Sequence, residues 1–387
     1  MDTQLSSLPA VFIGGPPHSG KSILSARLTR ALRLRQIEHY LLRASPDGEG
    51  SWLYITETAR AAELRQRAKT DWTTWLSARL AQDVTNRQLP LLVDGGGKIT
   101  DEVRAIAERC THAIVIAAQP AACEEWAAFV ASCGLAPIAL LQSAIDGIDT
   151  SIQANGVLRG TITGLTNDRP SDGPTFHALL DALTERFDRP PDSLFATHAA
   201  ATDIDLVLHI ERPIFPLPAH GPDRPWLVAE LPTLLANVPA GVPLAIYGVG
   251  PIWLLAALAC HAAPERCALF DARSGWVETL TLRPGAPGDA TLLRIDPTLT
   301  DAAVRLHIDI PGSYFAVERL PDLALPALPP ARGVIIDGKL PTWLAATIAR
   351  SYAAHPWVAL YQPPLQQGII IGGTDRARHG AIVPMEK

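Results

Sequence analysis

The sequence predicts an α/β protein: an N-terminal domain of the P-loop NTPase type, built on a parallel sheet, followed by two tandem α+β units. Three observations predict this. A glycine-rich motif, GPPHSGKS, occupies residues 15–22. Apolar strand-like runs then alternate with helix-like segments as far as residue 190, which is typical of a parallel sheet covered on both faces. Finally, a pattern that starts near residue 205 occurs again near residue 300.

The glycine-rich motif fits the phosphate-binding pattern G-x-x-x-x-G-K-[ST] at every position, between an apolar run and a helix-like segment. Gly15 and Gly20 allow backbone N–H groups to face a phosphate, and the N-terminus of the following helix adds partial positive charge. Lys21 can reach the β- and γ-phosphates, and the Ser22 hydroxyl can bind magnesium. We therefore expect this loop to bind ATP with Mg²⁺; the alternative is a glycine-rich turn that binds nothing.

A second part of the expected nucleotide site is the segment LPLLVD, residues 89–94, which ends in Asp94. An aspartate at the tip of a strand beside the phosphate-binding loop would bind magnesium through Ser22 or through a water molecule. Three glycines follow Asp94, with no adjacent second acid of the kind many hydrolytic ATPases use to polarise water. The segment therefore favours nucleotide binding without rapid hydrolysis.

The remaining N-terminal elements follow from apolar runs and helical spacing. We expect strands over residues 39–42, 113–116 and 137–141, an edge strand over 156–164, and helices over 23–35, 57–86, 124–132 and 176–187. The polar segment 45–51 is expected to be a surface turn, with a loop that closes over a substrate as the alternative. The expected domains are 1–190, a linker at 191–204 that includes the alanine-rich 196–201, and the two units 205–299 and 300–387.

Composition excludes several classes of protein. With 48% apolar and 19% charged residues, the 387-residue chain has ample material for packed cores. Its net charge of −6 gives no general basic field, so binding to a long nucleic acid is not expected. The five cysteines form no C-x-x-C pair and the N-terminus resembles no signal peptide, which favours reduced thiols in a cytoplasmic protein. The longest apolar stretch is too short to cross a membrane.

The C-terminal half contains two copies of one pattern. LVLHIE at 206–211 resembles VRLHID at 304–309, and each copy continues as long connection, strand, helix, strand and final strand. The matched histidines, His209 and His307, lie in strand-like runs, so we expect packing or a strand-edge hydrogen bond for them. Four further residues of the first copy match four of the second: Gly248, Pro251, Trp253 and Leu254 match Gly338, Pro341, Trp343 and Leu344.

The two turns before these helices are a second candidate phosphate site. Gly248, Gly250 and Pro251 in the first copy, and Gly338 with Lys339 in the second, leave free backbone N–H groups at a helix start. A plain strand-to-helix turn is the favoured alternative. Trp253 and Trp343 are placed to stack on a base, but tryptophans beside small apolar residues are more often part of a core.

Three segments of the second copy resemble a small CRISPR-associated family. They are RGVIIDGKLPTWL at 332–344, SYAAHPWVALY at 351–361 and GIIIG at 368–372, and the first copy carries the same core at 247–254. In these segments the chain resembles the ring nucleases of type III CRISPR systems, which cleave the cyclic tetra-adenylate messenger. The resemblance covers nearly all of residues 300–387. The family is also known as fusions with an N-terminal P-loop ATPase-like domain, which is the layout of this chain.

The resemblance implies only part of a catalytic site in each copy. The family has an aspartate, one residue and an arginine after its third strand; Asp271 and Arg273 keep this pattern in the first copy, whereas the second has Gln362 and Pro364 there. In the alignment with the family, Ala354 occupies the position of a histidine, and His355 is the next residue of this chain.

The resemblance therefore implies either a shared site, with Asp271 and Arg273 from one copy and His355 from the other, or copies that have become binding modules. In a shared site, His355 or Asp271 would act as base or acid, and Arg273 or Lys339 would face the phosphoryl oxygens.

The function implied is that of a phosphodiesterase that binds and linearises cyclic tetra-adenylate and so ends an antiviral signal. The P-loop domain would bind ATP and aid assembly or regulation, and the chain would work as a homo-oligomer, because a ring of adenylates is itself symmetric. Two other classes stay open. One is a P-loop kinase or ATPase gated by the cyclic oligoadenylate, and the other is a non-catalytic sponge for the messenger.

Overall fold

The computed structural model describes residues 8–44, 74–166, 173–190, 192–300 and 302–384 of the chain. Contacts within it divide the chain into two units at Leu194, and the short segment Ala272–Ser274 groups with the first. The expected surface turn at 45–51, and residues 57–73 of the expected helices, lie outside the described residues.

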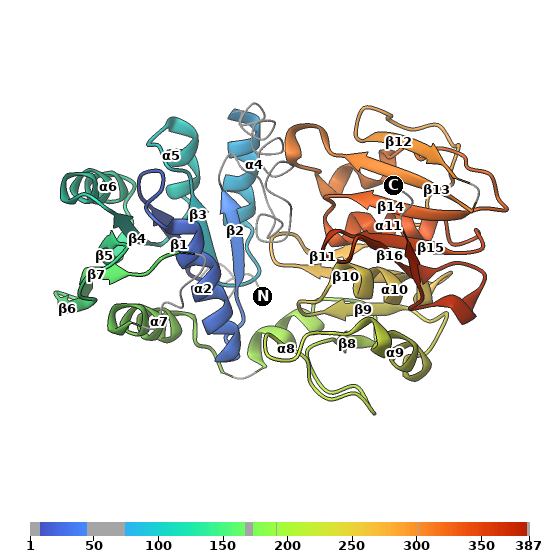
Figure 1. Cartoon of the computed structure of the whole chain (residues 1–387), viewed down its shortest axis with the longest axis horizontal. Coiled ribbons are helices and arrows are strands. Elements are labelled where there is room, and N and C mark those ends of the chain that lie inside the picture. Colours follow the sequence, from blue (N-terminus) through green and yellow to red (C-terminus); the bar gives the residue numbers. More distant parts are fainter. Residues whose placement is uncertain (1–7, 45–73, 167–172, 191, 301, 385–387) are drawn as a thin grey trace. The chain divides into compact units, whose positions relative to one another are not determined.

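The first unit is built on a seven-stranded sheet with the strand order β2-β3-β1-β4-β5-β7-β6 (Figure 1). All neighbouring strands pair in parallel except β6 with β7. This confirms the parallel sheet predicted from the alternation of strands and helices. The strands are β1 (Ala10–Gly14), β2 (Tyr40–Ala44), β3 (Leu91–Gly95), β4 (His112–Ala117), β5 (Ala136–Ala144), β6 (Thr150–Ala154) and β7 (Val157–Thr163).

Helices pack on both faces of this sheet. Val11 and Ile13 of β1 share a core with the apolar side chains of α2 and α7, whereas Phe12 faces the other side and packs against Phe129 of α6, with 6.4 Å between ring centroids. Both faces are therefore buried, as the unbroken apolar runs of the strands predict. The helices are α2 (Lys21–Leu34), α4 (Thr74–Thr85), α5 (Asp101–Ala107), α6 (Pro120–Ser132) and α7 (Pro174–Phe187).

Two local expectations are corrected by the structure. The segment predicted as an edge strand, β7, lies inside the sheet, because β6 pairs with it and forms the edge. Part of the alanine-rich segment expected in the linker is helical, as α8 (Ser193–Ala199). Alanine is the strongest helix former, so this composition favours a helix over a flexible connection.

The second unit contains two sheets. The four-stranded sheet has the order β11-β10-β9-β8, and the six-stranded sheet has the order β12-β13-β14-β15-β16-β17. In each copy the first three strands are parallel and the fourth is antiparallel, so β8, β9, β10 and β11 correspond to β13, β14, β15 and β16. The strands are β8 (Val207–His209), β9 (Leu244–Tyr247), β10 (Cys267–Asp271), β11 (Gly275–Glu278), β12 (Arg294–Leu299), β13 (Ala303–Asp309), β14 (Gly333–Gly338), β15 (Val358–Gln362), β16 (Gln367–Gly372) and β17 (Ile382–Pro384).

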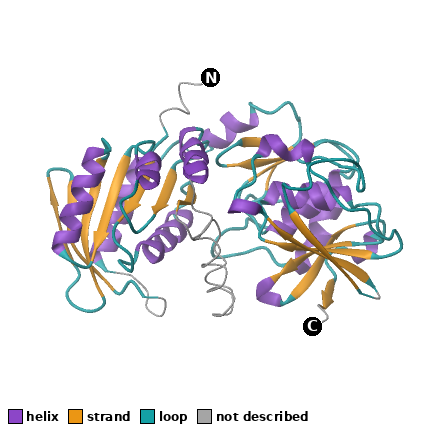
Figure 2. Ribbon diagram, turned by 90° about the horizontal axis from the view of Figure 1, so that it is seen from above, coloured by secondary structure: helices purple, strands orange, loops and turns teal. Residues whose placement is uncertain are grey.

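Two helices lie between these sheets (Figure 2). Helix α10 (Ile252–Ala262) packs against α11 (Thr342–Ser351) and also against β16 of the other copy. Most residues of both helices are buried, including the polar Thr347, Arg350 and Ser351 of α11. A third helix, α9 (Leu231–Asn237), and short 3₁₀ turns connect the strands; the turns are Val228–Glu230, Pro311–Ser313, Val317–Asp322, Pro363–Leu365 and Arg376–Arg378.

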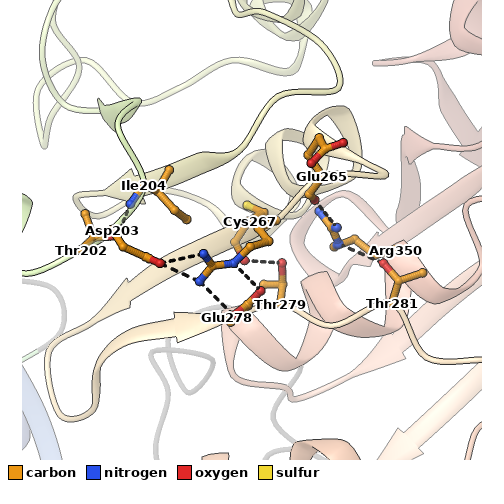
Figure 3. Close-up of polar contacts among 10 residues, drawn as sticks. Thr202, Asp203, Ile204, Glu265, Cys267, Glu278, Thr279, Thr281 and Arg350 are labelled. Atoms are coloured by element: carbon orange, nitrogen blue, oxygen red, sulfur yellow. Dashed lines mark hydrogen bonds and ion pairs between the residues drawn. The ribbon is translucent and has the colours of Figure 1, made fainter.

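Polar contacts join the two copies inside the second unit. The buried Arg350 of α11 donates hydrogen bonds to the backbone carbonyls of Ala259 and Glu265, both at 2.6 Å, and Figure 3 shows its guanidinium beside Glu265 and Thr281. Ala259 lies in the last turn of α10, where carbonyls have no partner within the helix. Arg350 therefore provides a hydrogen-bond donor to a carbonyl group at the C-terminal end of α10, the helix of the other copy.

Among the helices that the structure describes, none is both long enough and apolar enough to cross a membrane. The five cysteines are all free thiols, which agrees with the reduced state expected from their number and spacing.

Candidate functional site

The phosphate-binding loop joins the end of β1 to the start of α2. Gly15 has a φ of 155°, and a Cβ atom there would lie 1.9 Å from the carbonyl oxygen of Ile116. Gly20 has a φ of 87° and immediately precedes α2. Both positions therefore require glycine, one because of close packing and the other because of its left-handed backbone.

Lys21 lies in the first turn of α2 with its ammonium folded back over the loop. The Nζ donates hydrogen bonds of 2.7 Å to the carbonyl oxygens of Gly15 and Pro16. Burial lowers the pKa of Lys21 from its ordinary value of 10.5 to about 8, and the charge of Asp94 partly opposes this shift. The loop thus holds a buried cation where the motif predicts one.

Asp94 lies on β3, the strand next to β1, and its register partner is Ile13. Its side chain is 2% exposed. Gly15, Gly20 and Lys21 thus follow the end of β1, next to the end of β3 that carries Asp94, and the nucleotide site expected there stays a prediction. Ser22 lies beside Lys21 and is exposed at the start of α2.

The turn before α10 differs from the phosphate site proposed for it. The backbone N–H of Val249 donates to Glu211 Oε2 at 3.0 Å, so a carboxylate of the chain itself accepts one of the expected free N–H groups. Gly248 has a φ of 106°, and a Cβ atom on Gly250 would lie 2.5 Å from Ile210 Cδ1. Here the geometry favours a plain strand-to-helix turn, with Pro251 as the N-cap of α10.

The corresponding turn of the second copy has an exposed cation. Gly338 ends β14, and a Cβ atom on it would lie 2.2 Å from the carbonyl oxygen of Ile308. The exposed Lys339 follows, and α11 starts two residues after Leu340. Close packing of β14 on β13 therefore explains this glycine, and the anion-binding role expected for Lys339 stays a prediction.

Trp253 and Trp343 are core residues. They are 5% and 2% exposed and lie in the hydrophobic cluster that fills the space between the two sheets. The ring of Trp343 packs edge-on against Phe315, with 5.9 Å between centroids. Neither ring faces solvent. The structure therefore favours a core role for both tryptophans over stacking on a base.

Of the three residues implied as catalytic, two lie at the β10–β11 turn and the third is buried in the second copy. Asp271 is the last residue of β10 and pairs with Gly275 of β11, and Arg273 lies in the turn between these strands. His355 is buried between α11 and β15, and its Nδ1 lies 2.9 Å from the carbonyl oxygen of Arg332. The structure thus gives His355 a packing and hydrogen-bonding role within its own copy.

The structure also shows a polar cluster on β13 and β14 that the sequence did not predict. His307 Nδ1 lies 3.1 Å from Asp337 Oδ2, and Arg305 Nε donates to the same oxygen at 3.1 Å. The expectation for His307 was packing or a strand-edge hydrogen bond. The polar residues at every second position of β13 were visible in the sequence, but the acidic partner lies on β14, 30 residues further along the chain.

Comparison with known families is informative for the C-terminal part. Residues 309–384 match the model of a family described as CRISPR-associated protein (Cas_csx3). This range contains β14, α11, β15 and β16, the elements that carry the three segments described above. The chain therefore contains a CRISPR-associated domain of this family at its C-terminal end.

Proposed function

We propose that this protein is a ring nuclease that binds and linearises cyclic tetra-adenylate. The observation that carries the proposal is the match of residues 309–384 to a CRISPR-associated family, together with the ring-nuclease-like segments inside that range. The paired copies add support: both have the same order of strands around a buried helix, and they share one core. Two related surfaces on one chain suit a ligand made of repeated nucleotides, and a homo-oligomer would supply further copies.

The P-loop domain is proposed to bind ATP with Mg²⁺, and the residues present fit that ligand. Lys21 would offer a cation for the phosphates, Gly15 and Gly20 would allow close backbone approach, and Ser22 and Asp94 would hold the metal ion. The bound nucleotide would supply negative charge and binding energy at this end of the sheet. Its proposed use is to stabilise an assembled state of the chain, since nothing next to Asp94 supplies a second acid.

The affinity for ATP is expected to fall as the pH rises above about 8. The pKa of Lys21 is about 8, and the charged ammonium is the form that attracts phosphate. Binding above this pH must take up a proton, so affinity at pH 9 should be about tenfold lower than at pH 7. Titration calorimetry at both pH values measures this. The Lys21→Arg variant keeps its charge and should lack the pH dependence; equal wild-type affinities at pH 7 and pH 9 would contradict the prediction.

A binding titration tests the proposed ligand. Radiolabelled cyclic tetra-adenylate should be retained by the full-length protein on a filter, and unlabelled ring should displace it at lower concentrations than linear tetra-adenylate. Failure to retain the ring in the presence and absence of Mg-ATP would overturn the proposal. Retention of the ring without any product would instead favour the sponge, an alternative motivated by Gln362 where the family has aspartate.

A further inference from the structure

The outward face of the six-stranded sheet has a row of polar side chains on β13, beside an apolar cluster formed by Ile335, Ala359 and Ile370. In β13, Val304, Leu306 and Ile308 point into the core between the sheets. Side chains alternate along a strand, so Arg305, His307 and Asp309 lie on the opposite face. The side chains of these three residues are 31%, 37% and 39% exposed, which leaves them accessible to a ligand.

Asp337 holds this row of side chains in place from the neighbouring strand. Its side chain is only 8% exposed, and it lies opposite His307 in the parallel register of β13 and β14. Because a carboxylate only accepts hydrogen bonds, the 3.1 Å contact places a proton on His307 Nδ1. In the neutral imidazole the lone pair is then on Nε2, the nitrogen that does not face Asp337. A buried carboxylate that fixes the tautomer of a half-exposed imidazole is the arrangement that catalytic histidines use.

The matched histidine of the first copy, His209, has different surroundings. His209 Nδ1 accepts a hydrogen bond from the backbone N–H of Glu211 at 3.4 Å, so its lone pair points into the chain. The position that matches Asp337 is Tyr247, whose ring centroid lies 5.1 Å from that of His209. Phe195 packs on the same imidazole at 4.9 Å. The Nδ1 atoms of the two matched histidines therefore have opposite roles: that of His209 accepts a hydrogen bond, whereas that of His307 donates one to Asp337.

We propose that His307 is the general base of phosphodiester cleavage, and that Asp337 is its positioning residue. The inference rests on the proposed function. His307 Nε2 takes the proton of a ribose 2′-OH, the 2′ oxygen attacks the adjacent phosphorus, and the bond from phosphorus to the 5′ oxygen breaks. The imidazolium returns its proton to the 5′ oxygen, so the products are a 2′,3′-cyclic phosphate and a 5′-hydroxyl.

A second carboxylate lies near the other ring nitrogen of His307. Asp309 Oδ1 lies 3.8 Å from His307 Nε2, where its charge favours the imidazolium that forms when the base takes a proton. Among the described residues, no group of three or more histidine, cysteine, aspartate or glutamate side chains is arranged to hold a metal ion. The charged or titratable groups that face this imidazole or its neighbours come from four strands: Arg294 and Asp296 of β12, Arg305 and Asp309 of β13, Asp337 of β14 and Tyr361 of β15.

The test compares His307→Gln with His209→Gln in single-turnover cleavage of radiolabelled cyclic tetra-adenylate by the full-length protein. His307→Gln should lose at least about 100-fold in rate and keep its affinity for the ring, whereas His209→Gln should cleave like the wild type. Equal rates for wild type and His307→Gln, or equal losses in both variants, would overturn the inference and leave the proposed function standing. A wild type that never cleaves the ring would overturn both.

The Asp337→Asn variant tests the positioning role by a different readout. Loss of the carboxylate removes a charge that favours the imidazolium, so the acidic limb of the pH–rate profile should move to lower pH and the maximal rate should fall at least about tenfold. A merely structural Asp337 would lower activity without moving that limb. This measurement also tests the inference if His307→Gln does not fold. If the acidic limb of the pH–rate profile is the same in Asp337→Asn as in the wild type, the inference is overturned.

Discussion

Replacing Asp271 with alanine is expected to reduce the rate of cyclic tetra-adenylate cleavage at least about 100-fold, while affinity for the ring changes by less than about threefold. Asp271 ends β10 immediately before the turn that contains Arg273. The resemblance to ring nucleases assigns an aspartate and an arginine with this spacing to the chemical step. A group that acts on the reacting atoms affects the rate far more than the binding of the ground state.

The matched control for this prediction is Gln362→Ala. Gln362 ends β15, the strand of the second copy that corresponds to β10, and it pairs with Gln367 as Asp271 pairs with Gly275. It carries no acid, so its replacement should leave the rate unchanged. Single-turnover rates and filter binding on both variants provide the comparison. If the Asp271→Ala protein cleaves at the wild-type rate, Asp271 is not part of the catalytic site.

Replacing Arg350 with methionine is expected to lower the free energy of unfolding of the second unit by about 2–4 kcal/mol. Arg350 is 3% exposed and donates to two backbone carbonyls of the first copy, one of them in the last turn of α10. Methionine fills similar space without the donors, so the carbonyls of Ala259 and Glu265 lose a charged partner in a buried place. Urea unfolding of the full chain, with hydrogen exchange of the α10 and α11 amides, localises the loss.

Arg266→Met is the control for this stability prediction. Arg266 makes ion pairs with Asp203 and Glu278, but its side chain is 50% exposed, and such pairs contribute little to stability. Exchange of the α10 amides should therefore stay close to wild type in this variant. If both arginine variants changed the exchange of α10 equally, the proposed cross-link between the copies would be refuted.

Much of the fold was predictable because its patterns are local. The loop at 15–22 combines two glycines with a lysine next to an apolar run, and the run that ends in Asp94 is buried along its whole length. The duplication was visible because glycine, proline and tryptophan recur with the same spacing before α10 and α11. Each of these features depends on residues that are near one another in the chain.

Other features depend on pairing between distant residues. The edge strand β6 has mostly exposed side chains, including Ile152 at 68%, so no apolar alternation marked it. The contact between His307 and Asp337 depends on the parallel register of β13 and β14. The use of Glu211 as an acceptor for Val249 likewise joins two turns 38 residues apart. Such pairs cannot be predicted from the spacing of residues along the chain, because they depend on the register between strands.

The most direct test of the ring-nuclease proposal is incubation of the purified wild type with radiolabelled cyclic tetra-adenylate, with and without ATP and Mg²⁺, and separation of products by thin-layer chromatography. The account predicts linear di- or tetra-adenylate in reactions that lack ATP, because the groups assigned to cleavage all lie in the second unit or the turn of its β10–β11 hairpin. An intact ring under every condition would contradict it.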